Sequence, residues 1–583
     1  MVKHMVSGRS DSWLSSLRAV STSSVFRSES SLSPENWLFA IRVAFWLFGT
    51  VLAIVQAWSY RYWVSADGIS YLDLSDALSG MGWHRIINGT WSPLYPILLG
   101  LGRILRPDRY GEVVTGHLVN IILFVGTFLA FEYFLCSLWP RQPLTDAVAQ
   151  NRQAPRWPWF VLGYSIFLSA FLVESTLRYL RPDILMAFFL FLAMGLLIRI
   201  CQNGATWSRY SALGAVLGMG YLAKQPMLPI GFLIIATSAL ACKSRVALSK
   251  ALFAALLMLL IGAAYFVPLS KARGYVTFGE ASTYNYLVYV DQRSESAYLM
   301  DPGAGSGHFL HVPTKISDTP PTYSFPTEEA ATHLLRYDPS YWTQGGKARF
   351  SAGGQIRAVF RNFKPFIDTL ERNGGLIAGL VVLCFAFADS RRILAGLCQQ
   401  WPVWGIGLIG LGMYAMVHVE DRYTAPFFAL FWLGLLSGVR LPRILSNRAA
   451  LAVALAISIS ILVPLVASAG HDVVDRRGAT DFSAEAARQL TSLGIRPADR
   501  VARISPWYTD YAWARMLRLS IIAEVDPVHA GEFWECGPEV QARVLKAMSQ
   551  AGARAVVAHI KTDTAPPLWQ RLGNTEQWIY WLN

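Results

Sequence analysis

Long apolar stretches recur along this chain, separated by short polar segments. Each stretch approaches the roughly 20 residues that a helix needs to cross a bilayer. The pattern therefore predicts an α-helical polytopic membrane protein. We expect about eleven spans, near residues 37–58, 112–136, 158–177, 182–200, 208–223, 226–241, 251–270, 375–388, 402–417, 423–439 and 449–469.

The composition agrees with this prediction. Hydrophobic residues make up 53% of the chain and charged residues 15%, whereas soluble domains carry roughly 25% charged residues. The formal net charge is +13, but residues 470–583 are close to neutral, so the excess belongs to the membrane part. Orientation in the membrane explains this excess better than nucleic-acid binding does, and we expect no nucleic-acid partner.

The placement of lysine and arginine predicts the topology. These residues gather in every second connection, which by the positive-inside rule puts the N-terminus in the cytoplasm of a multi-pass inner (plasma) membrane protein. We expect three parts: a Ser-rich, disordered cytoplasmic segment 1–36, a membrane domain 37–470 with external loops 59–111 and 271–374, and an extracytoplasmic domain 471–583.

The C-terminal part has a different pattern. Short β-like runs such as ARAVVAHI alternate with helical patterns such as SAEAARQLTSL, which predicts a small α/β domain with a mostly parallel sheet. In the first external loop, WSPLYPILLGLGRIL (91–105) is apolar but too short to span, and we expect an interfacial helix. The six cysteines form no C-x-x-C pair, so neither a disulfide framework nor a zinc site is indicated.

Asp67 directly follows the first span, in SADGISYLDLSDAL. A carboxylate there suits a general base that deprotonates an acceptor, and Gly68 would allow a tight turn that presents it. The alternative is an N-cap of the following helix. We expect Asp73 and Asp76, three residues apart, to be solvated surface charges.

A second group of charges lies in STLRYLRPDILMAFF. Pro182 and Asp183 suit the first turn of a helix, where a carboxylate complements the dipole. Arg178 and Arg181 would share one helical face and break the positive-inside pattern. Because guanidinium groups match phosphate oxygens, phosphate binding is the simplest use for them.

Two further junctions carry charge on the same predicted side. Lys224 lies between two spans in GYLAKQPMLPIG and either snorkels to the surface or contributes to the same site. Glu420, Asp421 and Arg422 lie in AMVHVEDRYTAPFF between the next-to-last pair of spans. They either close the turn as an internal ion pair or recognise a phosphate or sugar.

Together, these motifs resemble the GT-C superfamily of polytopic glycosyltransferases, which includes protein O-mannosyltransferases and lipid A aminoarabinose transferases. The acid Asp67 in the first external loop, WSPLYP, LRPD (180–183), YLAKQP (221–226) and EDRYTAP (420–426) occur in the family's order over residues 37–470. The resemblance implies an inverting transfer of sugar from a polyprenyl-phosphate donor. It implies Asp67 as the base and Arg178, Arg181, Lys224 and Arg422 at the donor phosphate, with Asp73, Asp183, Glu420 and Asp421 supporting them.

One departure bears on metal use. Many relatives carry adjacent acids in the first loop, whereas Gly68 follows Asp67 here, so a second acid would have to come from Asp73 or elsewhere. We expect no organic cofactor and no metal ligand set, and the use of a divalent metal stays open. The acceptor, a glycan, lipid or protein, is not indicated by the sequence.

Two alternatives belong to other classes. A secondary transporter should show internal repeats and charges near the bilayer midplane, but the charges here gather on one side. A catalytically silent lipid-binding or assembly protein would keep the same fold.

Overall fold

The structure is a computed structural model of the chain. It describes residues 34–79, 82–139, 157–242, 245–291, 309–327, 331–387, 390–438, 447–476, 480–561 and 567–582. The predicted disordered segment lies mostly outside these residues.

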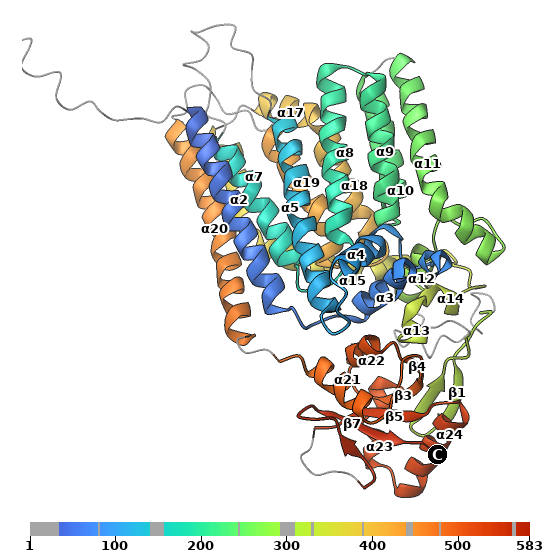
Figure 1. Ribbon diagram of the computed structural model, residues 1–583. Helices are drawn as coiled ribbons and strands as arrows, with labels where there is room; N and C mark the ends of the chain where they lie inside the picture. Colours follow the sequence, from blue (N-terminus) through green and yellow to red (C-terminus); the bar gives the residue numbers. More distant parts are fainter. Residues whose placement is uncertain are drawn as a thin grey trace, which may run out of the picture.

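Long helices stand side by side and form the larger part of the molecule (Figure 1). Six of them, within the described residues, are long and apolar enough to cross a membrane, and Met227–Cys242 and Trp401–Ala415 are shorter apolar helices. The predicted fold class is confirmed, although the count of eleven spans is not. The helices are α2 (Pro34–Ser59), α5 (Glu112–Leu138), α7 (Trp157–Ser169), α8 (Asp183–Asn203), α9 (Trp207–Ala223), α10 (Met227–Cys242), α11 (Arg245–Arg273), α16 (Gly374–Phe387), α17 (Ser390–Gln399), α18 (Trp401–Ala415), α19 (Asp421–Gly438) and α20 (Asn447–Asp475).

Glycines bring the backbones of α18 and α19 close together. A Cβ added at Gly407 would lie 2.6 Å from the backbone nitrogen of Phe431, and one at Gly434 would lie 2.5 Å from that of Trp404. Small residues allow such contact between membrane helices. The pair therefore forms a tight hairpin, and its turn holds the charged segment 418–422.

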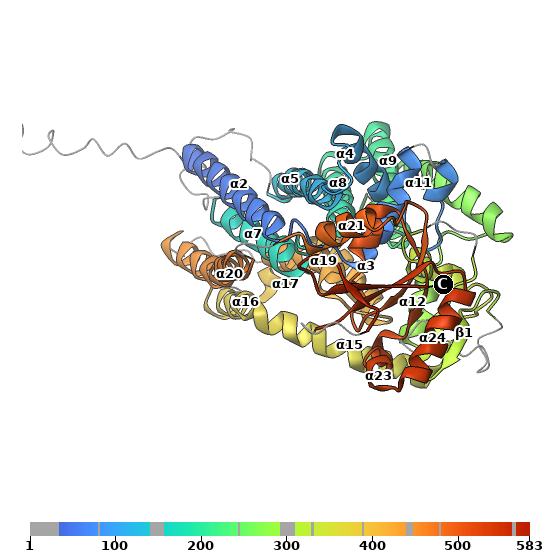
Figure 2. The ribbon, with the colours of Figure 1, turned by 60° about the horizontal axis from the view of Figure 1, so that its bottom comes forward.

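Helix α15 (Ala352–Arg372), seen in Figure 2, and several shorter helices, seen in Figure 1, form a layer at one end of the bundle. It includes α3 (Ala66–Ser75), α4 (Leu94–Leu105), α12 (Ala281–Tyr289), α13 (Leu334–Tyr337), α14 (Pro339–Trp342) and α15 (Ala352–Arg372). Helix α4 lies where the interfacial helix was expected. Helix α15 was not predicted, although its apolar and basic residues recur at helical spacing.

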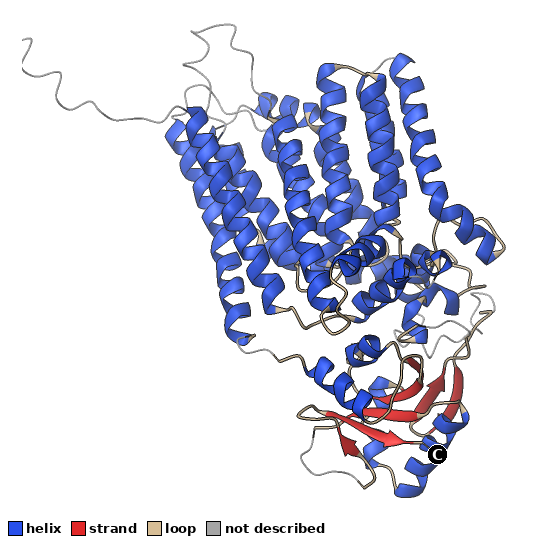
Figure 3. Cartoon of the chain, in the orientation of Figure 1, coloured by secondary structure: helices blue, strands red, loops and turns tan. Residues whose placement is uncertain are grey.

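A seven-stranded sheet lies beyond this layer (Figure 3), in the order β1-β2-β4-β3-β5-β7-β6. The prediction of a mostly parallel sheet is wrong, because only the pairs β3–β4 and β3–β5 are parallel. The segment 271–374, which was expected to be the second external loop, supplies β1 and β2, and these strands extend the sheet of the C-terminal part. The strands are β1 (Thr314–Asp318), β2 (Pro321–Ser324), β3 (Arg500–Ile504), β4 (Ser520–Val525), β5 (Ala555–His559), β6 (Gln570–Arg571) and β7 (Gln577–Trp581), with helices α21 (Phe482–Ser492), α22 (Ala512–Leu517), α23 (Glu532–Glu535) and α24 (Pro538–Gln550) around them.

One buried arginine joins the sheet part to the helical part. Arg515 of α22 is 1% exposed and donates hydrogen bonds to Asp73 (2.6 Å), Asp76 (2.7 and 2.8 Å) and Glu112 (3.0 and 3.2 Å). The expectation that Asp73 and Asp76 are solvated is therefore wrong. Although burial favours the neutral carboxyl, the guanidinium groups around Asp76, led by that of Arg515, hold its pKa well below the usual range. We call these four residues the Arg515 cage.

Candidate active site

Asp67 lies in the first turn of α3, at the end of the bundle that carries the sheet. The N-cap is Ser65, whose Oγ accepts from the backbone N–H of Gly68 at 3.2 Å, so the capping interpretation of Asp67 is wrong. The side chain of Asp67 is 32% exposed, more than the side chains of Arg181 and Arg422 with which it pairs. The carboxylate is thus held at the surface of the layer and remains accessible.

Gly68 has a different role from the one expected. It lies inside α3, and a Cβ there would meet Val64 Cγ2 at 2.7 Å and Leu180 Cβ at 3.2 Å. The absence of a side chain therefore allows α3 to pack directly against the segment that carries Arg181.

Cations from two distant segments meet at Asp67. Arg181 Nε lies 3.7 Å and Arg422 Nη1 3.5 Å from Asp67 Oδ2. Arg422 Nη1 also lies 4.0 Å from Asp183 Oδ2. Four of the predicted residues are therefore brought into one cluster by the fold.

Lys224 enters the same cluster through Asp183. Its Nζ lies 2.5 Å from Asp183 Oδ1 and 4.0 Å from the centre of the Tyr423 ring. Burial lowers the pKa of Lys224 below its ordinary value, while the Asp183 carboxylate opposes this shift. Lys224 does not snorkel away from the bundle, so the alternative interpretation of this residue is wrong.

Glu420 holds Arg422 from the other side. Its Oε2 accepts from Arg422 Nε at 2.6 Å, and its Oε1 lies 3.3 Å from Nε2 of His418. Burial disfavours the charge, but the contacts with His418 and Arg422 keep the pKa of Glu420 well below its usual range. The guanidinium of Arg422 is thereby fixed between three carboxylates.

Arg178 is not part of this cluster. The segment 175–182 is not helical, so the expectation that Arg178 and Arg181 share a helical face is wrong. The guanidinium of Arg178 lies 2.7 Å from a carboxylate oxygen of Asp472 on α20 and donates to Ser468 at 3.2 Å. Arg178 therefore ties α20 to the bundle.

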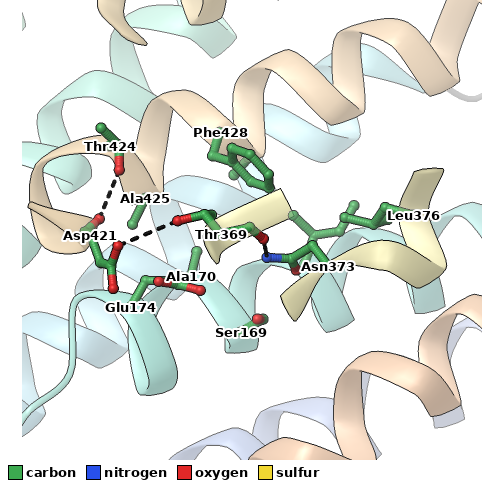
Figure 4. A pocket seen from close by; sticks show the side chains of 12 residues that line it. Ser169, Ala170, Glu174, Thr369, Asn373, Leu376, Asp421, Thr424, Ala425 and Phe428 are labelled. Atoms are coloured by element: carbon green, nitrogen blue, oxygen red, sulfur yellow. Dashed lines mark hydrogen bonds between the residues drawn. The ribbon is translucent and has the colours of Figure 1, made fainter. Parts of the chain in front are cut away.

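Asp421 also points elsewhere. Its carboxylate accepts from Arg372 Nη2 at 2.8 Å and from Thr369 at 3.3 Å, both at the end of α15. Figure 4 shows it beside Glu174 and Thr369, around a water-sized cavity. The turn 420–422 thus sends Glu420 and Arg422 toward Asp67 and Asp421 toward α15. Asp73, the other predicted supporting acid, belongs to the Arg515 cage.

Two clefts flank the cluster. A polar cleft of about 400 Å³ has Arg181, Arg422, Glu420 and Arg372 in its lining. A more apolar cleft of about 260 Å³ between α10, α12 and α18 is lined by residues that include Leu228, Met413, His418 and Tyr423. The turn that holds Arg422 therefore separates a polar space from an apolar one.

The cluster has groups that remain available to a ligand. Within the described residues, Nε of Arg181 and Oδ2 of Asp183 have no hydrogen-bond partner although both are buried. Three cations face three carboxylates, and an entering anion would have to replace one of the carboxylates. Asp183 and Glu420 each have one close cation, at 2.5 and 2.6 Å, whereas Asp67 lies 3.5 and 3.7 Å from its cations and is the easiest to replace.

Metal ligation is not apparent in the part of the chain that the structure describes, since no three His, Cys, Asp or Glu side chains there are placed to hold an ion. Sequence reasoning missed Arg372 and Tyr423, which line the two clefts. Tyr423 follows Arg422 directly, so it could have been found. Arg372 ends a helix that was not predicted.

Comparison with known proteins shows similarity of fold alone. No protein-family model and no curated protein matched the chain. Among solved structures, ArnT from Cupriavidus metallidurans in the apo state is 13% identical, with 93% of this chain and 96% of that chain covered and a TM-score of 0.40. The same protein bound to undecaprenyl phosphate is 11% identical, with 92% of this chain and 97% of that chain covered and a TM-score of 0.42.

The oligosaccharyltransferase of Archaeoglobus fulgidus, tethered to an acceptor peptide, is also similar. It is 13% identical over 90% of this chain and 69% of its own, with a TM-score of 0.47. At such low identities and TM-scores, the similarity assigns no reaction and no residue role to this chain.

Proposed function

We propose that this protein is an inverting glycosyltransferase that moves a sugar from a polyprenyl-phosphate donor to an acceptor at the extracytoplasmic face of the membrane. One observation carries the proposal. Arg181, Lys224 and Arg422, from three separate segments, converge with Asp67 between an apolar and a polar cleft. A lipid phosphate and a polar acceptor could meet at such a boundary.

The donor fits the apolar side. Its prenyl chain would lie in the cleft between α10, α12 and α18, and its phosphate would reach Lys224 and Arg422. Phosphate is already a good leaving group, so the site needs cations that stabilise the departing charge and no second acid that protonates it. Arg422 is held in place by Glu420, which suits preorganised stabilisation of that charge.

The acceptor would enter the polar cleft beside Arg181. Asp67 takes a proton from its hydroxyl or amine, the acceptor atom bonds to the anomeric carbon, and the bond from that carbon to the phosphate oxygen breaks. The electron pair leaves with the polyprenyl phosphate, and a single displacement inverts the anomeric centre. The donor phosphate would take the place of the Asp67 carboxylate beside Arg181 and Arg422, and Asp67 would then be free to contact the acceptor.

The test separates binding from chemistry. The full-length protein in nanodiscs is given a radiolabelled polyprenyl-phosphate sugar and a mixed acceptor extract. D67N should retain the donor but lose turnover by roughly 10²–10⁴-fold, the usual contribution of a general base. K224Q should lose donor retention, and D475N, an exposed acid on α20, should behave as wild type.

Three results would count against the proposal. Full turnover by D67N would leave the transferase without its base. Proton- or ion-coupled flux through the reconstituted wild type, with no lipid-linked donor bound, would favour the transporter. A D67N variant and wild type that both retain the lipid and never turn over would favour the silent lipid-binding protein.

A further inference from the structure

A third cleft, of about 500 Å³, lies where the sheet part meets the layer of short helices. One wall carries Arg85 and Arg109 of the helical part. The other carries Arg500, the first residue of β3, and Arg518, which follows α22. It differs from the Asp67 clefts in all of its lining residues.

The cleft has more positive than negative charge. Its acids, Asp73 and Asp76, belong to the Arg515 cage, in which three carboxylates are matched by the guanidinium groups of Arg515, Arg518 and Arg103. Arg85, Arg109 and Arg500 have no ion pair among the residues that the structure describes. The cleft therefore has about three unmatched positive charges on its walls.

The backbone at one rim is strained. Ala498 and Arg518 have φ angles of 69° and 58°, in the left-handed region that side chains disfavour. They face each other, since the N–H of Ala498 donates to the carbonyl oxygen of Arg518 at 2.9 Å. Such residues gather at ligand sites, where the surrounding structure holds them in place.

The neighbouring helix α4 places this cleft close to the membrane surface. The side chains of Leu101, Ile104 and Leu105, on its second half, are 48, 56 and 87% exposed. Exposed apolar residues on an interfacial helix favour burial at the level of the lipid headgroups. Arg109 follows this helix by four residues, so the mouth of the cleft would open near that level.

We propose that this arginine cleft binds a phosphate-bearing anion, either on a lipid headgroup or on a soluble compound. Planar guanidinium groups on opposite walls suit the oxygens of one phosphate or of two linked ones. The site would lie apart from the proposed transfer site and does not depend on the proposed function.

Binding of inorganic pyrophosphate to the full-length protein in phosphatidylcholine nanodiscs tests the proposal by calorimetry. R109Q/R500Q should bind pyrophosphate about 100-fold more weakly than wild type, because the loss of each charge-assisted contact should lower the affinity about tenfold. Both side chains are exposed, so their loss should leave folding intact. The matched control is R543Q/K546Q, which removes the same charge from exposed positions of α24 outside the cleft.

A second arm identifies the source of the phosphate. Native mass spectrometry of nanodiscs containing phosphatidic acid would show this lipid retained by wild type and lost from R109Q/R500Q if a headgroup is bound. Pyrophosphate binding without lipid retention would indicate a soluble ligand. The proposal is overturned if wild type binds neither pyrophosphate nor phosphatidic acid. It is also overturned if R543Q/K546Q loses as much pyrophosphate affinity as R109Q/R500Q does.

Discussion

Replacing Arg515 by methionine should release the sheet part from the helical part. Its guanidinium is buried against Asp73, Asp76 and Glu112, and methionine would leave these carboxylates without their shared cation. Arg103 and Arg518 would still contact Asp76 and Glu112. The loss therefore falls mainly on Asp73, whose remaining donors are the N–H and hydroxyl groups of Thr332.

The size of the effect follows from this arrangement. Removing one partner of a buried ion pair costs about 3–5 kcal/mol. We take about 4 kcal/mol for one uncompensated carboxylate, which weakens the docking equilibrium about 1,000-fold. Because Asp73 and Asp67 lie on the same short helix, undocking should also disturb Asp67 and lower turnover of the proposed transfer reaction.

Hydrogen exchange of the full-length protein in nanodiscs measures this docking. Backbone amides of α22 and α3 should exchange far faster in R515M than in wild type. The increase should reach about 1,000-fold, the factor by which docking is weakened, for amides that exchange only after undocking. R543M on α24, whose side chain is exposed, should leave exchange unchanged.

A double-mutant cycle supplies the strict test. D73N removes the stranded charge, so D73N/R515M should recover much of the protection lost in R515M. The reasoning is refuted if the amides of R515M exchange like those of wild type. It is also refuted if the effects of D73N and R515M on the free energy of exchange are additive.

Four further results are expected. G68A should cost about 1–3 kcal/mol by overpacking and lower turnover, whereas G470A, with open space around its Cβ, should not; thermal unfolding and turnover compare them. R178Q should lower the melting temperature without changing the donor KM, whereas R181Q should raise that KM. The folded-state pKa of Glu420 is lowered, so wild type should exceed E420Q in melting temperature above about pH 4.3, and the difference should shrink below it. Chelation with EDTA should leave turnover intact, because the proposed step uses arginine and lysine at the phosphate, and its loss would point to a metal.

The helices could be predicted because their signal is local. A run of apolar residues near membrane thickness has few stable alternatives, since every backbone polar group in lipid must be paired within the chain. The same holds for α4, whose short apolar length and proline predicted an interfacial helix. The sheet was predicted less well, because its strands β1 and β2 come from a loop more than a hundred residues before the others.

The predicted site shows the same division. Charged residues at span junctions are costly in lipid, so Lys224 and Arg422 could be recognised as candidates from position alone. The ion-pair partners of these residues could not be recognised in this way. Arg178 and Arg181 were equivalent by spacing, yet one pairs with Asp472 on α20 and the other with Asp67.

The sequence by itself therefore determined that this is a helical membrane protein, where most of its long apolar helices lie and which junctions carry charge, because hydrophobic length and residue position act locally. Only the tertiary structure decided which charges meet. Asp73 and Arg515 are 442 residues apart, and Asp67 and Arg422 are 355 apart. Ion pairs form over a few ångströms, so their partners depend on how distant segments pack.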